Sequence, residues 1–392
     1  MKLLFVHDHK FKHDGFLTYS NGTFPSSIWR RYLSVSDGLT VVGRDGGKLS
    51  SLEKNYTVSS EELVDFILLP DLSNIKSLLY TSPDVLTKCR NLVADHDGII
   101  ARLPSRMGQL FIGEAVKQGK PYAVEVVGCA WDAFWSHGSF RGKLIAPFAY
   151  FKTKKIISES SFALYVTESY LQNIYPCKKK HSFCSNVEIP VVERNVLTAR
   201  FLNKKKKNGK LFFGLIGNYS SSYKGIDVLI NALGMADSRL PDWEVQIVGA
   251  GDSGPYEKLA KKLGISSRVK FLGSLPSGDA VYNWLDSVDV YVQPSLTEGL
   301  PRALIEAMSR GCPAIASRVG GIPELLESAQ MVEPANSSAL ADALVSLAGD
   351  DESLSNLSEA NFKKASKYYK PVLEKRRAEF WLDFKHYILS KS

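Results

Sequence analysis

The chain has 392 residues, of which 44% are hydrophobic and 23% charged, enough for two globular domains of ordinary size. No window holds 18 consecutive apolar residues, so the sequence predicts no membrane-spanning helix. The five cysteines form no C-x-x-C pair, which favours free thiols in a cytoplasmic protein over a disulfide framework or a zinc site. The first residues are too briefly apolar for a signal peptide, and Leu3–Val6 is expected to be a buried strand.

The net charge of +8 is unevenly distributed. Between Arg141 and Lys210 there are 15 Lys or Arg against 4 Glu and no Asp, a local balance of +11. Three runs supply most of it: Lys152–Lys155, Lys178–Lys180 and Lys204–Lys207. Solvated loops and a charged linker would account for this segment. Alternatively, it contacts anionic lipid head groups or a lipid-diphosphate acceptor, at the inner face of the membrane. Nucleic acid ranks third, because no recognition motif accompanies the charge.

Short apolar runs alternate with helical patterns along the chain, which favours parallel sheets covered by helices on both faces. In the first half the expected strands are Lys2–Val6, Thr40–Val42, Phe66–Leu69, Gly98–Ala101, Tyr122–Val127 and Phe162–Val166. In the second half they are Leu211–Ile216, Glu244–Val248, Val269–Leu272, Val288–Gln293, Pro313–Ser317 and a weak one near Met331. The fold class expected is α/β, with two Rossmann-like, doubly wound domains whose strand ends face a central cleft.

The domain boundaries follow from composition. Residues 1–195 form the expected first domain, on the acceptor side, and the polar, lysine-rich stretch 196–210 the linker. Residues 211–367 form the second domain. The stretch 368–392 is predicted as a helix with Trp381, Phe384 and Ile388 on one stripe, long enough to cross back to the first domain.

The most informative segment is Val290–Arg318. A β-rich run is followed by a polar loop, and a helix opens around Pro301. The free N–H groups and the dipole of its first turn favour a diphosphate. Glu298 in the loop and Glu306 on the helix have seven residues between them. Carboxylates beside an anion site suit the hydroxyls of a sugar and a ribose, although a helix cap and a surface residue would also fit.

Four further segments accompany this one. Gly214–Leu229 contains a strand, a polar loop with Gly217 and Asn218, and a Lys-Gly pair at Lys224. Gly249, the loop at Leu275 and the pair Gly320-Gly321 follow in order. From Gly214 to about Leu347 these segments resemble, in order and spacing, the retaining GT-B glycosyltransferases of the family numbered four. The signature of that family is the glutamate–seven residues–glutamate motif.

The resemblance implies a role for each matching position. Lys224 would bind the donor diphosphate, Glu306 the ribose and Glu298 the donor sugar. The loop at Leu275 would recognise the base. The remaining positions expected around the phosphates are Gly217, Asn218, Gly249, Gly299, Leu300 and Arg302. The implied donor is a nucleotide sugar, with UDP favoured over GDP, used as a substrate without any cofactor or metal.

The sequence departs from the family pattern at two places. Asn218 stands where many members have an arginine, so Arg302 or another base would replace that cation. The first-domain histidine is missing from the stretch Pro121–Gly128. Asp132 and the cluster His7-Asp8-His9 are candidates there by their position at strand ends, with local turn chemistry as the alternative.

Three apparent motifs are discounted. The pattern G-x-G-x-x-G at Gly249–Gly254 lacks the acidic residue of a nicotinamide site after the next strand. Asp95-His96-Asp97 precedes a strand, so it lies at the wrong sheet edge for a metal. The histidines near the N-terminus have no metal-ligand spacing.

The predicted function is transfer of a hexose-type sugar from a nucleotide sugar to a cell-surface glycan or a lipid-linked saccharide, with retention and without a metal. A glycosyltransferase that makes a small soluble glycoside remains an alternative. A non-catalytic member that binds nucleotide or glycan is a second one, motivated by the missing histidine.

Overall fold

The computed structural model describes residues 1–50, 56–72, 81–135, 140–206 and 209–391, with the backbone alone at 134, 140, 141 and 203–206. The chain divides into two compact units. Unit 1 comprises Met1–Cys184 and the residues from Glu374 onward, and unit 2 comprises Ser185–Leu373. Lys207, from the third lysine run, lies outside the described residues.

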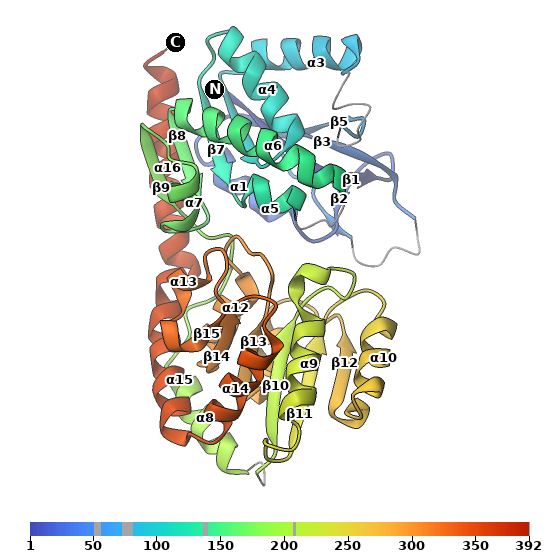
Figure 1. The fold of residues 1–392 in the computed structure, drawn as a ribbon. Helices are drawn as coiled ribbons and strands as arrows, with labels where there is room; N and C mark the ends of the chain where they lie inside the picture. The colour runs from blue at the N-terminus through green and yellow to red at the C-terminus, as the bar shows by residue number, and fades with distance from the viewer. Residues whose placement is uncertain (51–55, 73–80, 136–139, 207–208, 392) are drawn as a thin grey trace. The chain divides into compact units, whose positions relative to one another are not determined.

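The described residues of unit 1 contain a nine-stranded sheet. Its parallel strands run side by side in the order β5-β3-β1-β6-β7-β8-β9 (Figure 1). Strand β2 pairs antiparallel with β1, and β4 pairs antiparallel with β2. The strands are β1 (Lys2–His13), β2 (Thr18–Ser20), β3 (Gly38–Lys48), β4 (Thr57–Val58), β5 (Val64–Leu69), β6 (Gly98–Leu103), β7 (Tyr122–Val126), β8 (Phe162–Tyr165) and β9 (Lys180–Phe183). The helices are α1 (Arg30–Leu33), α3 (Pro83–Ala94), α4 (Arg106–Lys117), α5 (Ala130–Trp135), α6 (Phe140–Glu159) and α7 (Tyr170–Ile174), together with α16 (Lys370–Leu389), which belongs to unit 1 from Glu374 onward.

The core of unit 1 is built on the apolar runs of its central strands. Leu3–Val6 and every residue of β6 are buried, as expected for strands with helices on both faces. Helix α16 contributes its predicted stripe: the Trp381 ring lies 5.4 Å from Tyr32, and the Phe384 ring lies 5.3 Å from Phe162. The C-terminal helix therefore completes the core of unit 1.

Unit 2 contains a six-stranded parallel sheet in the order β12-β11-β10-β13-β14-β15. The strands are β10 (Leu211–Ile216), β11 (Trp243–Val248), β12 (Val269–Gly273), β13 (Val290–Gln293), β14 (Ala314–Ser317) and β15 (Met331–Val332). The helices are α8 (Asn195–Lys206), α9 (Ile226–Ala236), α10 (Gly254–Lys262), α11 (Asp279–Ser287), α12 (Arg302–Ser309), α13 (Ile322–Leu325), α14 (Ser337–Ala348) and α15 (Asp351–Ala365). The strand order reverses between β10 and β13, where doubly wound folds bind their ligands.

The structure differs from the sequence prediction at several elements. Strands β2 and β4 were not predicted, and the strand predicted at Thr40–Val42 extends over Gly38–Lys48. The strand predicted at Lys2–Val6 continues to His13, because its second half pairs with β2 and with the end of β3. The edge strand β9, with the polar sequence KHSF, was not predicted. Most of the predicted linker 196–210 is helix α8, which Arg200 fixes by donating to the carbonyl oxygens of Leu285 and Arg310 at 2.8 and 2.9 Å.

Candidate functional site

The carboxyl ends of β10 and β13 bring together two of the predicted site residues of unit 2. Lys224 lies in the turn after β10, and Glu298 lies in the loop after β13. The Lys224 Nζ and the Glu298 Oε1 are 2.7 Å apart, and both side chains are largely buried, at 20% and 10% exposure. The sequence had assigned these residues to different parts of the donor, and the structure joins them in one ion pair at the switch point.

Glycines allow the loops at this sheet edge to pack backbone against backbone. A Cβ on Gly225, which has a φ of +67°, would collide with the carbonyl oxygen of Pro294. One on Gly249 would meet the carbonyl oxygen of Gly217, and one on Gly320 that of Glu298. The N–H of Gly321 donates to the Gly299 carbonyl at 2.7 Å. The Lys-Gly and Gly-Gly pairs and Gly249 therefore serve one compact arrangement of loops.

One oxygen of Glu298 is held by three donors. Besides Lys224, its Oε1 accepts hydrogen bonds from the Ser295 Oγ at 2.8 Å and the Gln293 Nε2 at 3.2 Å. Gln293 is fixed in turn, because its Oε1 accepts from the Tyr291 hydroxyl at 2.9 Å. Among the described residues no hydrogen bond reaches Oε2 of Glu298. The carboxylate is oriented through one oxygen, and the other is available as an acceptor.

Helix α12 begins directly after this loop. Pro301 is its N-cap residue, and within the described part of the chain no side chain caps the helix. Its first-turn N–H groups and the positive end of its dipole therefore have no side-chain acceptor, which suits an anion. Arg302 is exposed at the first position.

Glu306 lies within α12 and is half-buried. Burial raises the pKa of its carboxyl above the ordinary value, and Arg302 opposes this shift. Burial, followed by the Glu306 charge, raises the pKa of Tyr282 to about 12. Because the carboxyl has no hydrogen-bond donor among the described residues, it is a buried acceptor suited to neutral donors such as hydroxyls.

Three other predicted positions lie in loops of unit 2. The Asn218 Oδ1 accepts from the Ser220 N–H at 2.8 Å, so it supports its own turn, and its side chain is exposed. Leu275 is half-exposed in the loop after β12, which adjoins the loop after β11 because the Gly249 N–H donates to the Gly273 carbonyl at 2.9 Å. Leu300 is half-exposed beside Gly299.

Unit 1 has its own switch point, between β1 and β6, and a carboxylate of the chain occupies it. Asp8 accepts hydrogen bonds from the N–H groups of Arg106 and Met107 at 2.5 and 2.9 Å. Ser105 caps the same helix, α4, by accepting from the Gly108 N–H at 2.9 Å. The N-terminus of α4 is therefore already satisfied by acceptors of the chain.

The histidines beside Asp8 are held in the neutral form. Burial lowers the pKa of His9 to about 4, with a further contribution from Arg44, and its Nε2 lies 2.9 Å from the Ser20 hydroxyl. Burial and the nearby Arg102 also lower the pKa of His7, whose buried Nδ1 has no hydrogen-bond partner among the residues that the structure describes.

Asp132 lies on the short helix α5. It accepts a hydrogen bond from the Tyr170 hydroxyl at 3.4 Å, and burial raises the pKa of that tyrosine. The two first-domain candidates predicted from the sequence therefore belong to different local networks.

The residues discounted as a metal site have structural partners. The His96 ring nitrogens lie 2.6 Å from the Leu92 carbonyl and 2.8 Å from the Thr40 hydroxyl, and Asp97 accepts from the Lys2 N–H at 2.7 Å. Across the described part of the chain, no group of three or more His, Cys, Asp or Glu could hold a metal ion. Within the same residues, no helix has the length and apolar character to cross a bilayer.

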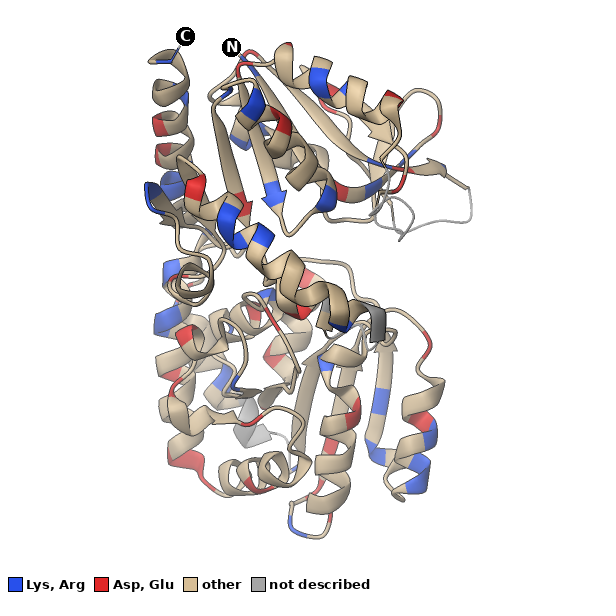
Figure 2. Ribbon diagram, turned by 45° about the horizontal axis from the view of Figure 1, so that its top comes forward, with Lys and Arg blue, Asp and Glu red and all other residues tan. Residues whose placement is uncertain are grey.

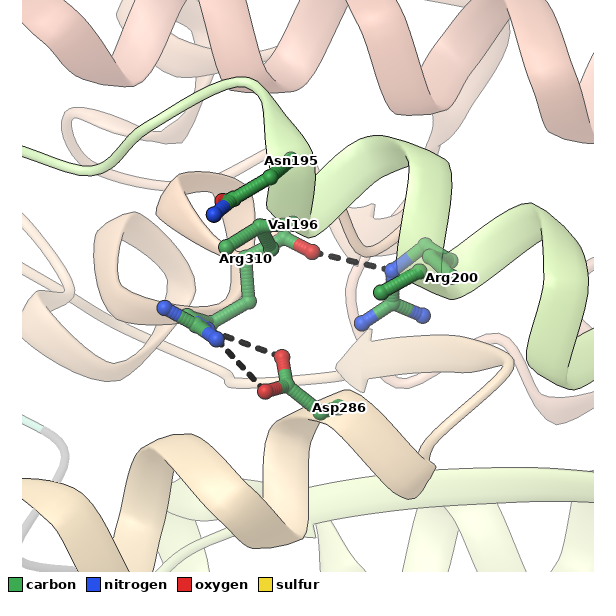
Figure 3. Close-up of a pocket in the computed structure, with 6 residues that line it drawn as sticks. Asn195, Val196, Arg200, Asp286 and Arg310 are labelled. Carbon is green, nitrogen blue, oxygen red and sulfur yellow. Dashed lines mark hydrogen bonds and ion pairs between the residues drawn. The ribbon is translucent and has the colours of Figure 1, made fainter.

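A cavity of about 270 Å³ lies beside the other end of α12, lined by Asn195, Val196, Ala199, Arg200, Asp286 and Arg310 (Figure 3). The Arg310 guanidinium forms a two-pronged ion pair with Asp286, and the Arg310 carbonyl accepts from Arg200. These charges hold α8 to α11 and α12, so we assign the cavity a structural role.

The sequence analysis missed the residues that orient Glu298. Gln293, Ser295 and Tyr291 were treated as strand and loop. The available signal was a fully buried glutamine at a strand end, since a buried amide needs partners. Tyr219 was also missed: its hydroxyl donates to the Ile247 carbonyl at 2.9 Å and accepts from the Gly273 N–H at 3.2 Å, joining two strand ends.

Residues 210–350 match the family model described as glycosyl transferases group 1. Protein CapJ of Staphylococcus aureus is 35% identical over 344 residues, which cover 85% of this chain and 83% of that protein. A D-inositol 3-phosphate glycosyltransferase of Corynebacterium glutamicum is 36% identical over 142 residues, 33% of either chain. A GDP-mannose-dependent monoacylated alpha-(1-6)-phosphatidylinositol monomannoside mannosyltransferase of the same species is 36% identical over 138 residues, 32% of this chain and 35% of that protein.

Solved structures also match over the whole chain, and two of them are described here. Sucrose-phosphate synthase from Thermosynechococcus elongatus has a TM-score of 0.68 at 15% identity, and both chains are covered completely. The Anabaena protein HepE, in complex with UDP-glucose, has a TM-score of 0.63 at 16% identity, again with complete coverage. At these identities the likeness shows the fold, which is GT-B.

Proposed function

Because the chain belongs to the glycosyl transferases group 1 family and is a glycosyltransferase of the GT-B type, we propose a specific reaction for it. It transfers a hexose-type sugar from a nucleotide sugar to a cell-surface glycan or a lipid-linked saccharide. A UDP-sugar is favoured over a GDP-sugar as the donor. The product retains the anomeric configuration of the donor, an expectation that rests on the glutamate motif. The observation that carries the proposal is the oriented Glu298 beside Lys224 and the uncapped α12.

The diphosphate would lie against the N-terminus of α12. First-turn N–H groups bind phosphate oxygens there, and the exposed Arg302 adds positive charge. Lys224 reaches the same edge of the sheet, but Glu298 neutralises it in this structure. An arriving diphosphate would share the Lys224 ammonium with Glu298. These groups would stabilise the charge that grows on the leaving nucleoside diphosphate, so we expect turnover to persist in EDTA.

The two glutamates would bind the hydroxyls. Glu306, a half-buried acceptor on α12, would take the ribose diol. Glu298 would use its Oε2 toward the donor sugar, since three donors of the chain already occupy its Oε1. HepE supports a UDP-sugar donor as a protein of the same fold that was solved with UDP-glucose.

The acceptor class is supported from two directions. The two corynebacterial relatives are named for inositol phosphate and phosphatidylinositol acceptors, which carry phosphate and, in one case, lipid. The basic balance between Arg141 and Lys210 suits such anionic acceptors and a peripheral contact with an anionic membrane. Asp132 stays a candidate for activating the acceptor hydroxyl.

A thermal-shift panel of UDP, GDP, ADP and CMP tests the proposal. A ligand at one hundred times its dissociation constant contributes about 2.7 kcal/mol to the stability of the folded chain. We expect UDP to give the largest shift, and UDP-sugar turnover to continue in EDTA. If none of the four nucleotides stabilises the chain, the donor assignment is wrong.

A further inference from the structure

Helix α6 of unit 1 buries small residues and exposes large apolar ones. The positions that pack inward recur every three or four residues and are mostly small: Gly142, Ala146, Ala149, Thr153 and Ile157. Three large apolar side chains face solvent instead, with 67% of Leu144, 69% of Phe148 and 67% of Phe151 exposed. A surface helix of a globular protein normally buries its large apolar residues and exposes its polar ones.

The three exposed side chains form one continuous stripe. They stand at positions i, i+4 and i+7, which share a face of an α-helix. Single exposed apolar residues need no explanation, but a row of them marks a surface that contacts something apolar. The stripe Leu144–Phe148–Phe151 therefore lacks its partner in the described chain.

The charged residues around the stripe are mostly positive. Lys143, Lys152, Lys154 and Lys155 lie on the same helix, and Lys and Arg gather on its C-terminal half (Figure 2). Glu159 is the one acidic residue of α6, and it pairs with Lys155 at 3.9 Å. Lys152 and Lys143 have no carboxylate partner among the described residues and lie over the aromatic rings of Phe148 and Trp135, at 6.0 and 5.5 Å.

A groove of about 440 Å³ between α3, α4 and α6 continues this surface. Its walls include the half-exposed Leu86 and the exposed Val116, and Arg106 and Lys152 both line it. Burial lowers the pKa of Lys152, and the nearby positive charge of Arg106 adds to this shift. The groove also has Lys117 and Lys155 in its lining, together with the carboxylates of Glu114 and Glu159.

We propose that the stripe face of α6 docks on an anionic lipid bilayer. Leu144, Phe148 and Phe151 insert at the boundary of head groups and acyl chains, and the lysines contact lipid phosphates. Large apolar side chains flanked by lysines complement a bilayer, which offers hydrocarbon below a layer of negative charge. The inference rests on the proposed function, because docking on a bilayer would bring the enzyme to a lipid-linked acceptor. In this inference, the peripheral contact with the membrane involves partial insertion of apolar side chains as well as charge attraction.

Labelling at the stripe tests insertion directly. All five native cysteines are buried, so Phe151→Cys introduces one exposed thiol for a polarity-sensitive fluorophore. We expect its emission to shift to the blue on vesicles of phosphatidylglycerol and phosphatidylcholine in equal parts. The matched control is Met235→Cys on α9, a site of 57% exposure that should give no shift. No shift at position 151, or an equal one at 235, would overturn the inference.

A second pair of variants measures what the stripe contributes. Phe148→Ser with Phe151→Ser should lower binding to the same vesicles by about tenfold or more, because two exposed aromatic side chains no longer insert. Met235→Ser should leave it unchanged. Residual binding of the parent at high salt, absent from the double variant, separates insertion from charge attraction. Unchanged vesicle binding by the double variant would overturn the inference.

The outcomes distinguish this inference from the proposed function. The double variant should bind UDP like the parent, because none of the residues that we assign to UDP lies on α6. A chain that binds the vesicles through α6 but binds no nucleoside diphosphate would refute the proposed function and leave the docking surface standing. If the stripe instead mediates self-association, the parent would dimerise without lipid and the double variant would be monomeric, which would refute membrane docking.

Discussion

The two units share a doubly wound topology, but their switch points are filled differently. In unit 1, between β1 and β6, Asp8 and Ser105 satisfy the N-terminus of α4. In unit 2, between β10 and β13, no side chain caps α12, and its neighbouring carboxylate, Glu298, points one oxygen at Lys224. The fold alone provides an anion site at each place, and the side chains decide which one stays open.

The two switch points also differ in how they would interact with a phosphate. Asp8 contributes a negative charge where a phosphate would have to lie, so a second anion there would be repelled. Glu298 is held away by Ser295 and Gln293 and is shared with a lysine, so the amides of α12 stay accessible. The donor nucleotide should therefore bind unit 2 and not unit 1. Each of the following variants changes a residue at one of the two switch points and so tests this difference.

The largest effect should come from Glu306→Ala. If Glu306 binds the ribose diol, the variant loses a hydrogen bond to a charged group, about 1.5–3 kcal/mol, or roughly ten- to a hundredfold in affinity for UDP and UDP-sugar alike. Calorimetric titration with UDP measures this loss. Parent-like affinity and turnover would show that this helix does not hold the nucleotide.

Lys224→Ala should weaken UDP binding by roughly tenfold and leave uridine binding unchanged, because only the diphosphate uses the ammonium. Glu298→Gln is the matched variant: it keeps the side-chain shape and frees Lys224 from its ion pair. UDP binding by this variant should be kept or strengthened, and turnover should fall because the sugar contact is altered. Equal losses of UDP and uridine in Lys224→Ala would argue against a phosphate contact.

Asp8→Ala tests the closed switch point. The start of α4 loses its acceptor, so the free energy of unfolding should fall by about 1 kcal/mol, as for other helix N-terminal acceptors, while the affinity for UDP stays within about twofold. Asp8→Asn keeps one acceptor oxygen and should lose less. Denaturant unfolding measures the stability, and a large fall in UDP affinity would place the nucleotide in unit 1.

The smallest effect concerns pH and Glu306, whose folded-state pKa burial raises above the ordinary 4.5. UDP binding needs the carboxylate, so affinity should fall several-fold as the pH drops through the raised pKa. Stability should move the opposite way: the contribution of this carboxyl is fully present below 4.5 and is lost as the pH rises through the raised value. Glu306→Gln should flatten both dependences, and an unchanged pH profile would contradict the assignment.

Much of the fold could be predicted from the sequence, because buried parallel strands leave continuous apolar runs. The strand predicted at Leu211–Ile216 is confirmed, and those at Glu244–Val248 and Pro313–Ser317 differ by one residue at one end. The segments that were not predicted are those whose sequence gives no such run. Edge strand β9 is polar, and helix α8 contains a basic run.

The site could be predicted in part, for a similar reason. Lys224 and Glu298 follow local patterns after strands, so their place at the sheet edge was visible in the sequence. Their ion pair was not, because 74 residues separate them and the fold alone brings them together. The cap that Asp8 provides for α4 spans 98 residues along the chain and leaves no local pattern either.

Hydrogen exchange of the whole chain, measured with and without saturating UDP, tests the central claim most directly. The account predicts slower exchange in peptides that cover 217–225 and 298–306, the loops and helix start beside Lys224 and Glu298. It predicts no change in peptides that cover 5–9 and 104–108, where Asp8 already satisfies the start of α4. Protection of the Asp8 region with an unchanged α12 would contradict it.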